Sequence, residues 1–184
     1  MRFGANADAA PDDTDIRILG LLQEDCRTPL ARLGEQVGPS APAVLERIKK
    51  LEAAGVVTGY HAIIDGRKIG YDVTAFIGVV TSDPESIGQF EQQVTGLVNV
   101  LECHHVTGAF TFLLKVKTAN TSSLERLITQ IRSMDGVART ETTVVLSTHI
   151  ERVQLGLHPH DTVPPTHSRR ARRSSEGPGQ LRRA

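Results

Sequence analysis

The sequence predicts an α+β chain of two domains, a winged helix-turn-helix followed by a ferredoxin-like βαββαβ domain. Two observations lead to this prediction: residues 28–60 combine short helical patterns with glycine-marked turns, and residues 74–150 alternate β-rich runs with amphipathic helices. The expected organisation is a disordered arm, the first domain, a linker, the second domain and a basic disordered tail, over residues 1–11, 12–65, 66–73, 74–150 and 151–184.

Two helices are predicted at the start of the first domain. Residues 12–14 supply an N-cap and first-turn acids for the first helix. Leu30, Leu33 and Val37 recur at helical spacing in the second. Gly34 lies inside that helix, where glycine costs about 1 kcal/mol against alanine. We therefore expect a close contact at Gly34 that excludes a larger side chain.

A third helix is predicted to begin at Ser40 and to end at Gly55. Its buried stripe is Val44, Ile48 and Leu51. Residues 56–64 are rich in β formers and are expected to form a wing hairpin around Thr58-Gly59. This arrangement fits the DNA major groove, with the third helix as the reading element.

The outward face of the third helix carries positive charge at Arg47, Lys49 and Lys50, which suits phosphates. Ser40 and Glu46 are the best candidates for base contacts, since a carboxylate can accept a hydrogen bond from cytosine N4. DNA shape is expected to supply much of the specificity. The alternative is a helical face used only for protein contacts. The predicted DNA-binding set is Arg27, Ser40, Ala41, Pro42, Glu46, Arg47, Lys49 and Lys50.

The second domain shows four β-rich runs and two helical patterns in the βαββαβ order. The expected strands are residues 74–80, 98–106, 110–117 and 140–146. One helix is expected between the first and second strands, and another between the third and fourth. The first helix spans residues 84–95, and the second is expected to open with a capping box at residues 122–125. Fold alone does not assign a function.

Residues 12–64 resemble the DNA-binding domain of the Lrp/AsnC family, the feast/famine regulators of bacteria and archaea. The matching positions are Asp12, Asp15, Ile18, Leu19, Leu22, Gln23, Arg27, Leu33, Ser40, Val44, Arg47, Leu51, Glu52, Gly55 and Val56. Further family marks follow in the second domain, at Gly70, Val106-Thr107-Gly108 and Gly136-Val137 among others. Gly34 and Pro39 depart from the Ala and Leu that members usually carry.

The resemblance implies a sequence-specific transcriptional regulator whose second domain forms homodimers and higher oligomers and senses a small molecule, often an amino acid. It places the effector against a loop and a segment of a neighbouring subunit, formed by Thr107, Gly108, Ala109, Phe110, Thr111, Met134, Gly136 and Val137. Many amino-acid-responsive members carry Asp where this chain has Thr111, a weaker and neutral partner for an ammonium group. The alternative is a loop that only joins dimers.

Composition and motifs argue against catalysis and metal binding. The two cysteines, Cys26 and Cys103, are far apart in sequence, and His104 and His105 should point to opposite faces of a strand. No nucleophile elbow, phosphate-binding glycine loop or pair of catalytic carboxylates occurs. We expect no catalytic or metal residues, no cofactor, no membrane span and a cytoplasmic protein.

Charge is unevenly distributed although the chain has no net charge. Residues 1–65 carry seven Lys/Arg against ten Asp/Glu, whereas residues 151–184 carry seven against three. Arg169, Arg170, Arg172 and Arg173 could grip phosphates without reading sequence, or the tail could simply aid solubility. The expected partner is a roughly palindromic DNA operator bound by a dimer. A ligand-independent architectural DNA-binding protein is the alternative function.

Overall fold

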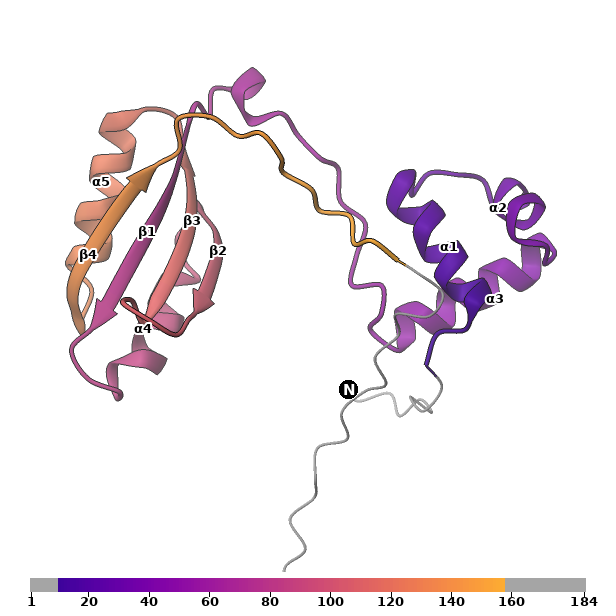
Figure 1. The fold of residues 1–184 in the computed structure, drawn as a ribbon, viewed down its shortest axis with the longest axis horizontal. Coiled ribbons are helices and arrows are strands. Elements are labelled where there is room, and N and C mark those ends of the chain that lie inside the picture. The colour runs from indigo at the N-terminus through magenta and orange to yellow at the C-terminus, as the bar shows by residue number, and fades with distance from the viewer. Residues whose placement is uncertain (1–9, 158–184) are drawn as a thin grey trace, which may run out of the picture. The chain divides into compact units, whose positions relative to one another are not determined.

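The computed structural model describes residues 10–157, so most of the predicted N-terminal arm and the arginine-rich part of the predicted tail lie outside the described residues. The chain forms two compact units (Figure 1). Of the described residues, one unit contains residues 10–60 together with residues 152–157, and the other contains His61–Glu151.

The first unit is built on three helices, α1 (Asp13–Glu24), α2 (Leu30–Val37) and α3 (Ala41–Ala53). Asp12 caps α1 through a reciprocal pair of bonds with Asp15, which satisfies two backbone donors at the helix start. The helices enclose a small core of buried apolar side chains, Ile18, Leu33, Val37, Val44 and Ile48. The apolar periodicity of the sequence therefore predicted both the helices and their buried faces.

The turn between α2 and α3 is tight, as the glycine in α2 predicted. A Cβ atom at Gly34 would lie 2.6 Å from the carbonyl oxygen of Pro39. Gly38 ends α2 with a positive φ of 105°, a conformation that favours glycine. The backbone approach at Gly34 brings the start of α3 against α2, so the angle between the two helices depends on the absence of a side chain there.

The predicted wing is wrong: residues 56–65 form no strand in the described structure. The N–H groups of Val56 and Val57 both donate to the carbonyl oxygen of Leu51, so they close the end of α3 instead of joining a ladder. The hydroxyl of Tyr60 donates to Glu52 at 2.9 Å, and burial followed by this contact raises the pKa of Tyr60 to about 12. The first unit is a helix-turn-helix that continues into an extended segment.

The second unit is a four-stranded antiparallel sheet with two helices on one face (Figure 1). The strands are β1 (Val73–Thr81), β2 (Val100–His105), β3 (Phe112–Thr118) and β4 (Val137–Val144), in the order β2-β3-β1-β4. The helices are α4 (Ser86–Val94) and α5 (Thr121–Arg132), and a short 3-10 helix, η1 (Gly66–Ile69), precedes β1. This is the predicted βαββαβ order.

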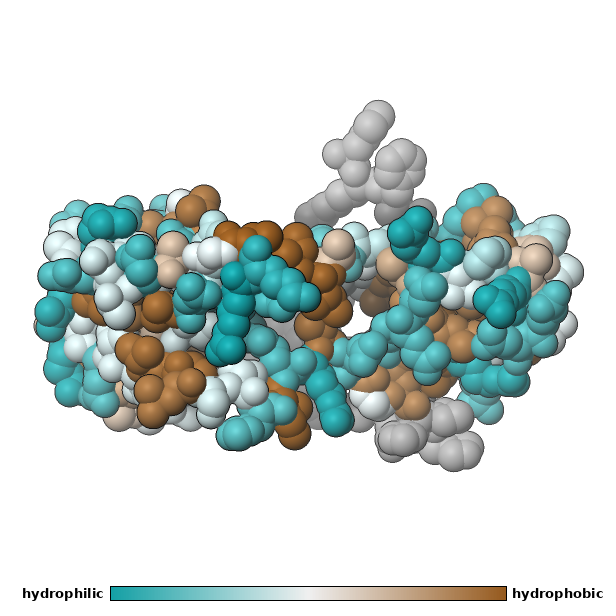
Figure 2. All heavy atoms as spheres, turned by 90° about the horizontal axis from the view of Figure 1, so that it is seen from above, coloured by the Kyte–Doolittle hydropathy of each residue, from teal (hydrophilic) through white to brown (hydrophobic). Residues whose placement is uncertain are grey.

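Alternate residues of the two central strands point into the helical layer. Ala75, Ile77 and Val79 of β1 and Leu114 and Val116 of β3 are fully buried with the apolar stripes of α4 and α5. Within residues 10–157 no helix covers the opposite face of the sheet, and Phe76 on it is 36% exposed. Figure 2 shows hydrophobic side chains breaking the polar surface of each unit in several places.

One predicted helix start in this unit differs from the structure. The capping box of α5 is formed by Asn120 and Ser123, and not by residues 122–125. The Asn120 side chain accepts from the N–H of Ser123, which leaves Ser122 within the first turn. Only residues 122–125 fit the sequence rule for a capping box, but Asn120 is itself a preferred N-cap residue, and the choice depends on where β3 ends.

Replacing Gly34 by alanine is expected to destabilise the first unit by about 1–3 kcal/mol, because the new methyl group would overlap a backbone oxygen that cannot move away easily. The measurement is the free energy of unfolding from urea titration of the full chain. Gly20→Ala is the matched control: it lies inside α1 with nothing near its Cβ position, so it should stabilise by about 1 kcal/mol or less. Equal effects of the two substitutions would contradict the close-contact interpretation.

Candidate nucleic-acid interface and effector site

The outward face of α3 displays the residues predicted to bind DNA. Val44, Ile48 and Leu51 turn into the core, so the remaining side chains face solvent. The half-buried or exposed residues there are Ser40, Ala41, Pro42, Glu46, Lys49 and Lys50. Ser40 occupies the N-cap position, but its side chain makes no capping bond. The hydroxyl of Ser40 is thus available to an outside partner.

Charge on this face is partly paired within the helix. Lys49 Nζ lies 3.1 Å from Glu46 Oε1, with both side chains more than half exposed. An exposed pair of this kind contributes about 0.2–1 kcal/mol, so an incoming phosphate or base can replace either partner at little cost. Lys50 makes no ion pair with any described residue.

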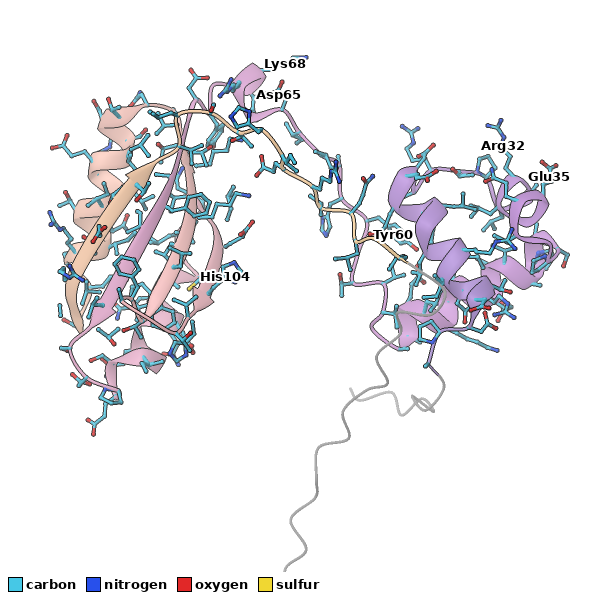
Figure 3. All side chains as sticks on the ribbon, viewed as in Figure 1. Arg32, Glu35, Tyr60, Asp65, Lys68 and His104 are labelled. Atoms are coloured by element: carbon cyan, nitrogen blue, oxygen red, sulfur yellow. The ribbon has the colours of Figure 1, made fainter. Side chains whose placement is uncertain are left out.

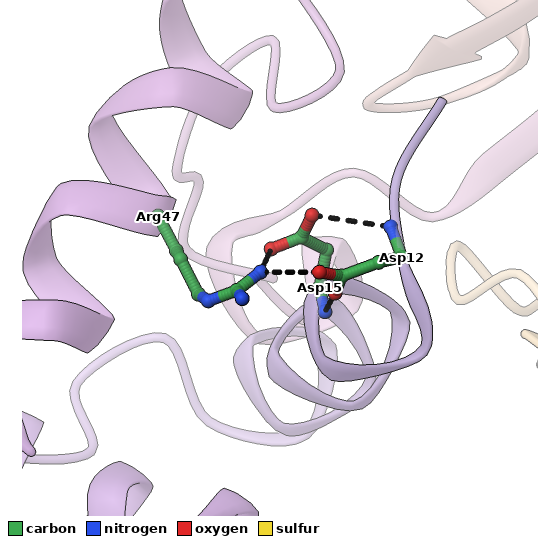
Figure 4. Close-up of polar contacts among 3 residues, drawn as sticks. All are labelled: Asp12, Asp15 and Arg47. Atoms are coloured by element: carbon green, nitrogen blue, oxygen red, sulfur yellow. Dashed lines mark hydrogen bonds and ion pairs between the residues drawn. The ribbon is translucent and has the colours of Figure 1, made fainter. Parts of the chain in front are cut away.

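Arg47 forms ion pairs within the first unit that the sequence did not predict. Its Nη1 atom lies 2.7 Å from Asp12 Oδ2 and 2.8 Å from Asp15 Oδ1 (Figure 4). The two carboxylates belong to the capping box of α1, so Arg47 joins α3 to the start of α1. Its charge is compensated by two carboxylates in the described structure, and its phosphate contact stays a prediction.

The start of α2 provides a second exposed region. Arg27 lies just before this helix, and its backbone N–H donates to Asp25 Oδ1 at 2.9 Å while its side chain is exposed. Arg32 and Glu35 point outward from the same helix (Figure 3). In helix-turn-helix proteins the first helix of the motif crosses the DNA backbone, so a phosphate contact from Arg27 stays a prediction.

The two segments predicted to bind an effector lie at the same end of the sheet within one chain. The N–H of Thr81 donates to Thr111 Oγ1 at 3.2 Å, and Thr81 is also the register partner of Val137. The Thr111 N–H donates to Val79 at 2.8 Å. Thr81, at the end of β1, therefore connects the loop between β2 and β3 to the start of β4.

Part of the predicted loop has a packing role. The ring of Phe110 covers Gly78, where an added Cβ would lie 2.6 Å from a ring carbon. Gly108 has a φ of 119°, so the turn itself needs a glycine. Thr107 and Ala109 are exposed at its tip. The exposed part of the loop is thus smaller than the set predicted from the sequence.

A carboxylate outside the predicted set lies beside the second segment. Ser86 N and Ser86 Oγ donate to Asp83 Oδ1 at 2.9 and 3.0 Å, and a Cβ on Gly136 would overlap Ser86. Hydrogen bonds from the Ser82 hydroxyl and then from Ser86 hold the pKa of Asp83 below its ordinary value. Met134 is half-buried in the same segment. An Asp three residues before a helical Ser is a helix-start pattern that could have indicated this position.

The cysteine and histidine cluster forms no metal site. His105 stacks on Phe112 with ring centroids 5.1 Å apart, whereas His104 Nε2 lies 3.3 Å from Glu102 on the other face of β2. Burial raises the pKa of the Cys103 thiol. No group of three potential ligands occurs among residues 10–157.

Replacing Arg47 by methionine is expected to lower the free energy of unfolding at pH 7 by about 1 kcal/mol or less, because the bonds to Asp12 and Asp15 are lost while the aliphatic packing remains. The backbone N–H of Asp15 and then Arg47 lower the pKa of Asp12 in the folded chain. The stability that Asp12 contributes is therefore fully present above its unfolded pKa of about 3.9, and it is lost as the pH falls through the pKa of Asp12 in the folded chain.

The difference between wild type and R47M should accordingly shrink below about pH 4, as measured by urea titration at several pH values. Lys49→Met is the matched control on the same helix, since its exposed pair with Glu46 should contribute less. A difference that stays constant down to about pH 2.5 would argue against the ion pairs.

Two family models match the sequence. The AsnC-type helix-turn-helix domain matches residues 12–52, and the Lrp/AsnC ligand binding domain matches residues 74–155. The regulatory protein AsnC of Haemophilus influenzae is 32% identical over 142 residues, which are 77% of this chain and 95% of that relative. Among the helices that the structure describes, none has the length and hydrophobicity needed to cross a bilayer.

Two solved structures extend the match to three dimensions. The feast or famine regulatory protein of M. tuberculosis, complexed with L-methionine, is 32% identical with a TM-score of 0.75, over 79% of this chain and 99% of that one. A transcriptional regulator of Neisseria meningitidis in complex with L-methionine is 29% identical with a TM-score of 0.76, over 80% and 97%. The chain therefore belongs to the Lrp/AsnC family, as a DNA-binding transcriptional regulator and not an enzyme.

Proposed function

We propose that α3 reads a roughly palindromic operator in the cytoplasm and that an amino acid bound in the sheet domain modulates this binding. The observation that carries the proposal is the exposed face of α3, which turns Ser40, Lys49 and Lys50 away from the core. The helix would lie in the major groove with its N-terminal residues against base edges. Lys49 and Lys50 would neutralise phosphates, and Arg47 would hold the helix at the correct angle.

A roughly palindromic operator calls for a pair of chains. A single helix-turn-helix covers one half-site, and a two-fold dimer binds two half-sites one or more helical turns apart. The sheet leaves β2 and β4 as unpaired edges and one face without helices, so each chain has surfaces that a second copy can cover. We propose homodimers that assemble further.

An amino-acid effector fits the groups at the β1 end described above. Thr111 replaces the aspartate that many amino-acid-responsive members carry, but Asp83 offers a carboxylate beside Gly136. Its low pKa keeps it ionised at neutral pH, as the binding of an α-ammonium group requires. The two solved relatives hold L-methionine, which supports an amino acid as the first candidate.

The DNA upstream of the protein's own gene is the first operator to test, by fluorescence anisotropy against a scrambled duplex, with and without a pool of amino acids. Tight, selective binding that shifts with the pool would support a metabolite-responsive regulator. Selective binding that no amino acid changes would contradict the effector proposal. Equal weak binding to both duplexes would favour the architectural alternative, in which DNA shape and charge dominate.

Variants of α3 separate phosphate contact from helix positioning in the same assay. Lys50→Gln should weaken binding to both duplexes and reduce the salt slope by about 1, because one phosphate contact is lost. Arg47→Met should leave the salt slope unchanged and lower affinity mainly for the operator, since it displaces α3 without removing a phosphate partner. A flattened slope for R47M would restore Arg47 as a phosphate contact.

Replacing Asp83 by asparagine should weaken the amino-acid response about tenfold or more while leaving operator affinity without ligand unchanged. Asparagine still accepts the bond from the N–H of Ser86, so α4 keeps its start while the negative charge is removed. Isothermal titration with L-methionine measures the effect. Glu85→Gln, an exposed neighbour, serves as the control. Equal responses of D83N and wild type would remove Asp83 from the site.

A further inference from the structure

A polar cavity of about 230 Å³ lies at the end of the sheet where the chain enters β1. Its walls belong to the sheet unit: part of the segment 64–72 around η1, one residue each of β1 and β3, and Thr148 and Glu151 after β4. η1 lies beside the start of β1 in Figure 1. The predicted effector segments meet instead at Thr81, at the other end of β1, so this cavity is a separate place in the fold.

Lys117 of β3 is a half-buried wall of this cavity. An added Cβ at Gly66 would lie 2.8 Å from Lys117 Cε and 3.0 Å from Lys117 Nζ, so the end of the lysine side chain runs against the backbone of η1. The ammonium group forms no ion pair or hydrogen bond with any of residues 10–157. Withdrawing a charge from water without a partner is unfavourable, so this position favours an anion from outside the chain.

Arg67 brings a second cation to the same cavity. Its backbone N–H donates to Asp65 Oδ1 at 3.1 Å, which starts η1, and the N–H of Tyr71 donates to the carbonyl oxygen of Gly66 at 2.8 Å, which closes the turn. The guanidinium group itself has no ion-pair partner within the described residues. The short helix thus holds the backbone of Arg67 in place while its positive charge stays available.

The carboxylates of the cavity are less available than its cations. Glu151 pairs with Lys115 at 2.5 Å, and this hydrogen bond is the main cause that lowers the pKa of Glu151. Asp65 is used as the cap of η1. Asp72 is exposed, where water and salt screen its charge. Two uncommitted cations therefore face one screened carboxylate, and the local balance favours an anionic ligand.

The size and polarity of the cavity narrow the class of anion. Sites for drug-sized ligands have volumes of about 300–1,000 Å³, so this smaller cavity suits a small metabolite and not a nucleotide. Apart from Ile64 and Tyr71 its walls are polar or glycine, which excludes an apolar ligand. A carboxylate accepts strong hydrogen bonds from either cation, and guanidinium can bind it through two parallel bonds. A molecule with two carboxylates matches Lys117 and Arg67 together.

We propose that this cavity binds a small dicarboxylate, with one carboxylate on Lys117 and the other on Arg67. The site is additional to the amino-acid site proposed at the Thr81 end. The sheet unit is joined to the first unit at His61 and at Glu151, and both stretches of chain that lead to these junctions contribute walls. A dicarboxylate in the cavity therefore lies between the two stretches and adds a contact between them.

The test is isothermal titration of the full-length protein with succinate, with butyrate as the matched probe that has the same four-carbon chain and one carboxylate. Succinate should bind with a Kd below about 1 mM. Butyrate should bind about tenfold more weakly or worse, because one charged contact is lost. Lys117→Gln and Arg67→Gln should each weaken succinate binding about tenfold for the same reason. Lys68→Gln, at an exposed lysine of η1 that is not a cavity wall, should bind succinate as wild type does.

Gly66→Ala tests the position of the ammonium group without changing any charge. The new methyl group would displace the flexible end of Lys117, so succinate binding should weaken about threefold or more. Hydrogen exchange at the Tyr71 amide should slow with succinate in wild type and stay unchanged in K117Q, which places the ligand at η1. Unfolding in urea checks that each variant is folded.

Several outcomes would overturn the proposal. They are a succinate Kd weaker than about 1 mM, equal binding of butyrate, or a loss in K68Q as large as that in K117Q. Competition between succinate and L-methionine would move succinate to the Thr81 end and so also overturn the separate site. Failure to bind DNA would contradict the proposed function and leave this binding measurement unaffected, so the two failures are distinguishable.

Discussion

The close approach of α2 to the turn before α3 is the constraint on which the DNA-binding unit depends. Gly34 leaves room for the carbonyl oxygen of Pro39, and Gly38 then reverses the chain through a positive φ. With the two helices so close, Leu33 and Val37 can share one small core with Val44 and Ile48. That core leaves only the other face of α3 for a partner. A few backbone contacts therefore decide which side chains can meet DNA.

Much of this could be predicted from the sequence because it depends on local rules. Apolar spacing located α1 to α3 and the βαββαβ order, and the position of Gly34 inside a helical pattern indicated the close contact. The absence of a wing hairpin could not be predicted in this way. Residues 56–64 have β-forming side chains, but the N–H groups of Val56 and Val57 are already used to close α3. A strand needs a partner, and local pattern does not supply one.

The site was less predictable than the fold because its contacts cross between elements. Arg47 has the spacing of a DNA-facing residue, yet it bonds Asp12 and Asp15, more than thirty positions earlier. Asp83 lies outside the motifs that suggested an effector site, and the packing of Ser86 and the hydrogen bonds of Ser82 against Gly136 bring it beside the predicted segment. Long-range pairs of this kind are invisible to periodicity. The residue types of the candidate site could be predicted from the sequence, whereas their hydrogen-bond and ion-pair partners could be identified only in the structure.

The sheet also limits how an effector can act. The loop ending at Thr111 and the start of β4 meet at Thr81, whereas the chain enters β1 at Val73 and leaves β4 at Val144, at the other end of the sheet. Nine residues of β1 separate these ends, about 30 Å of paired strand. β1 is hydrogen-bonded to a strand on each side along this length, which opposes a local rearrangement, and coupling needs two states with different affinities. We therefore propose that an effector bound at the Thr81 end acts on a neighbouring subunit and not through its own sheet, so that assembly is the step it controls.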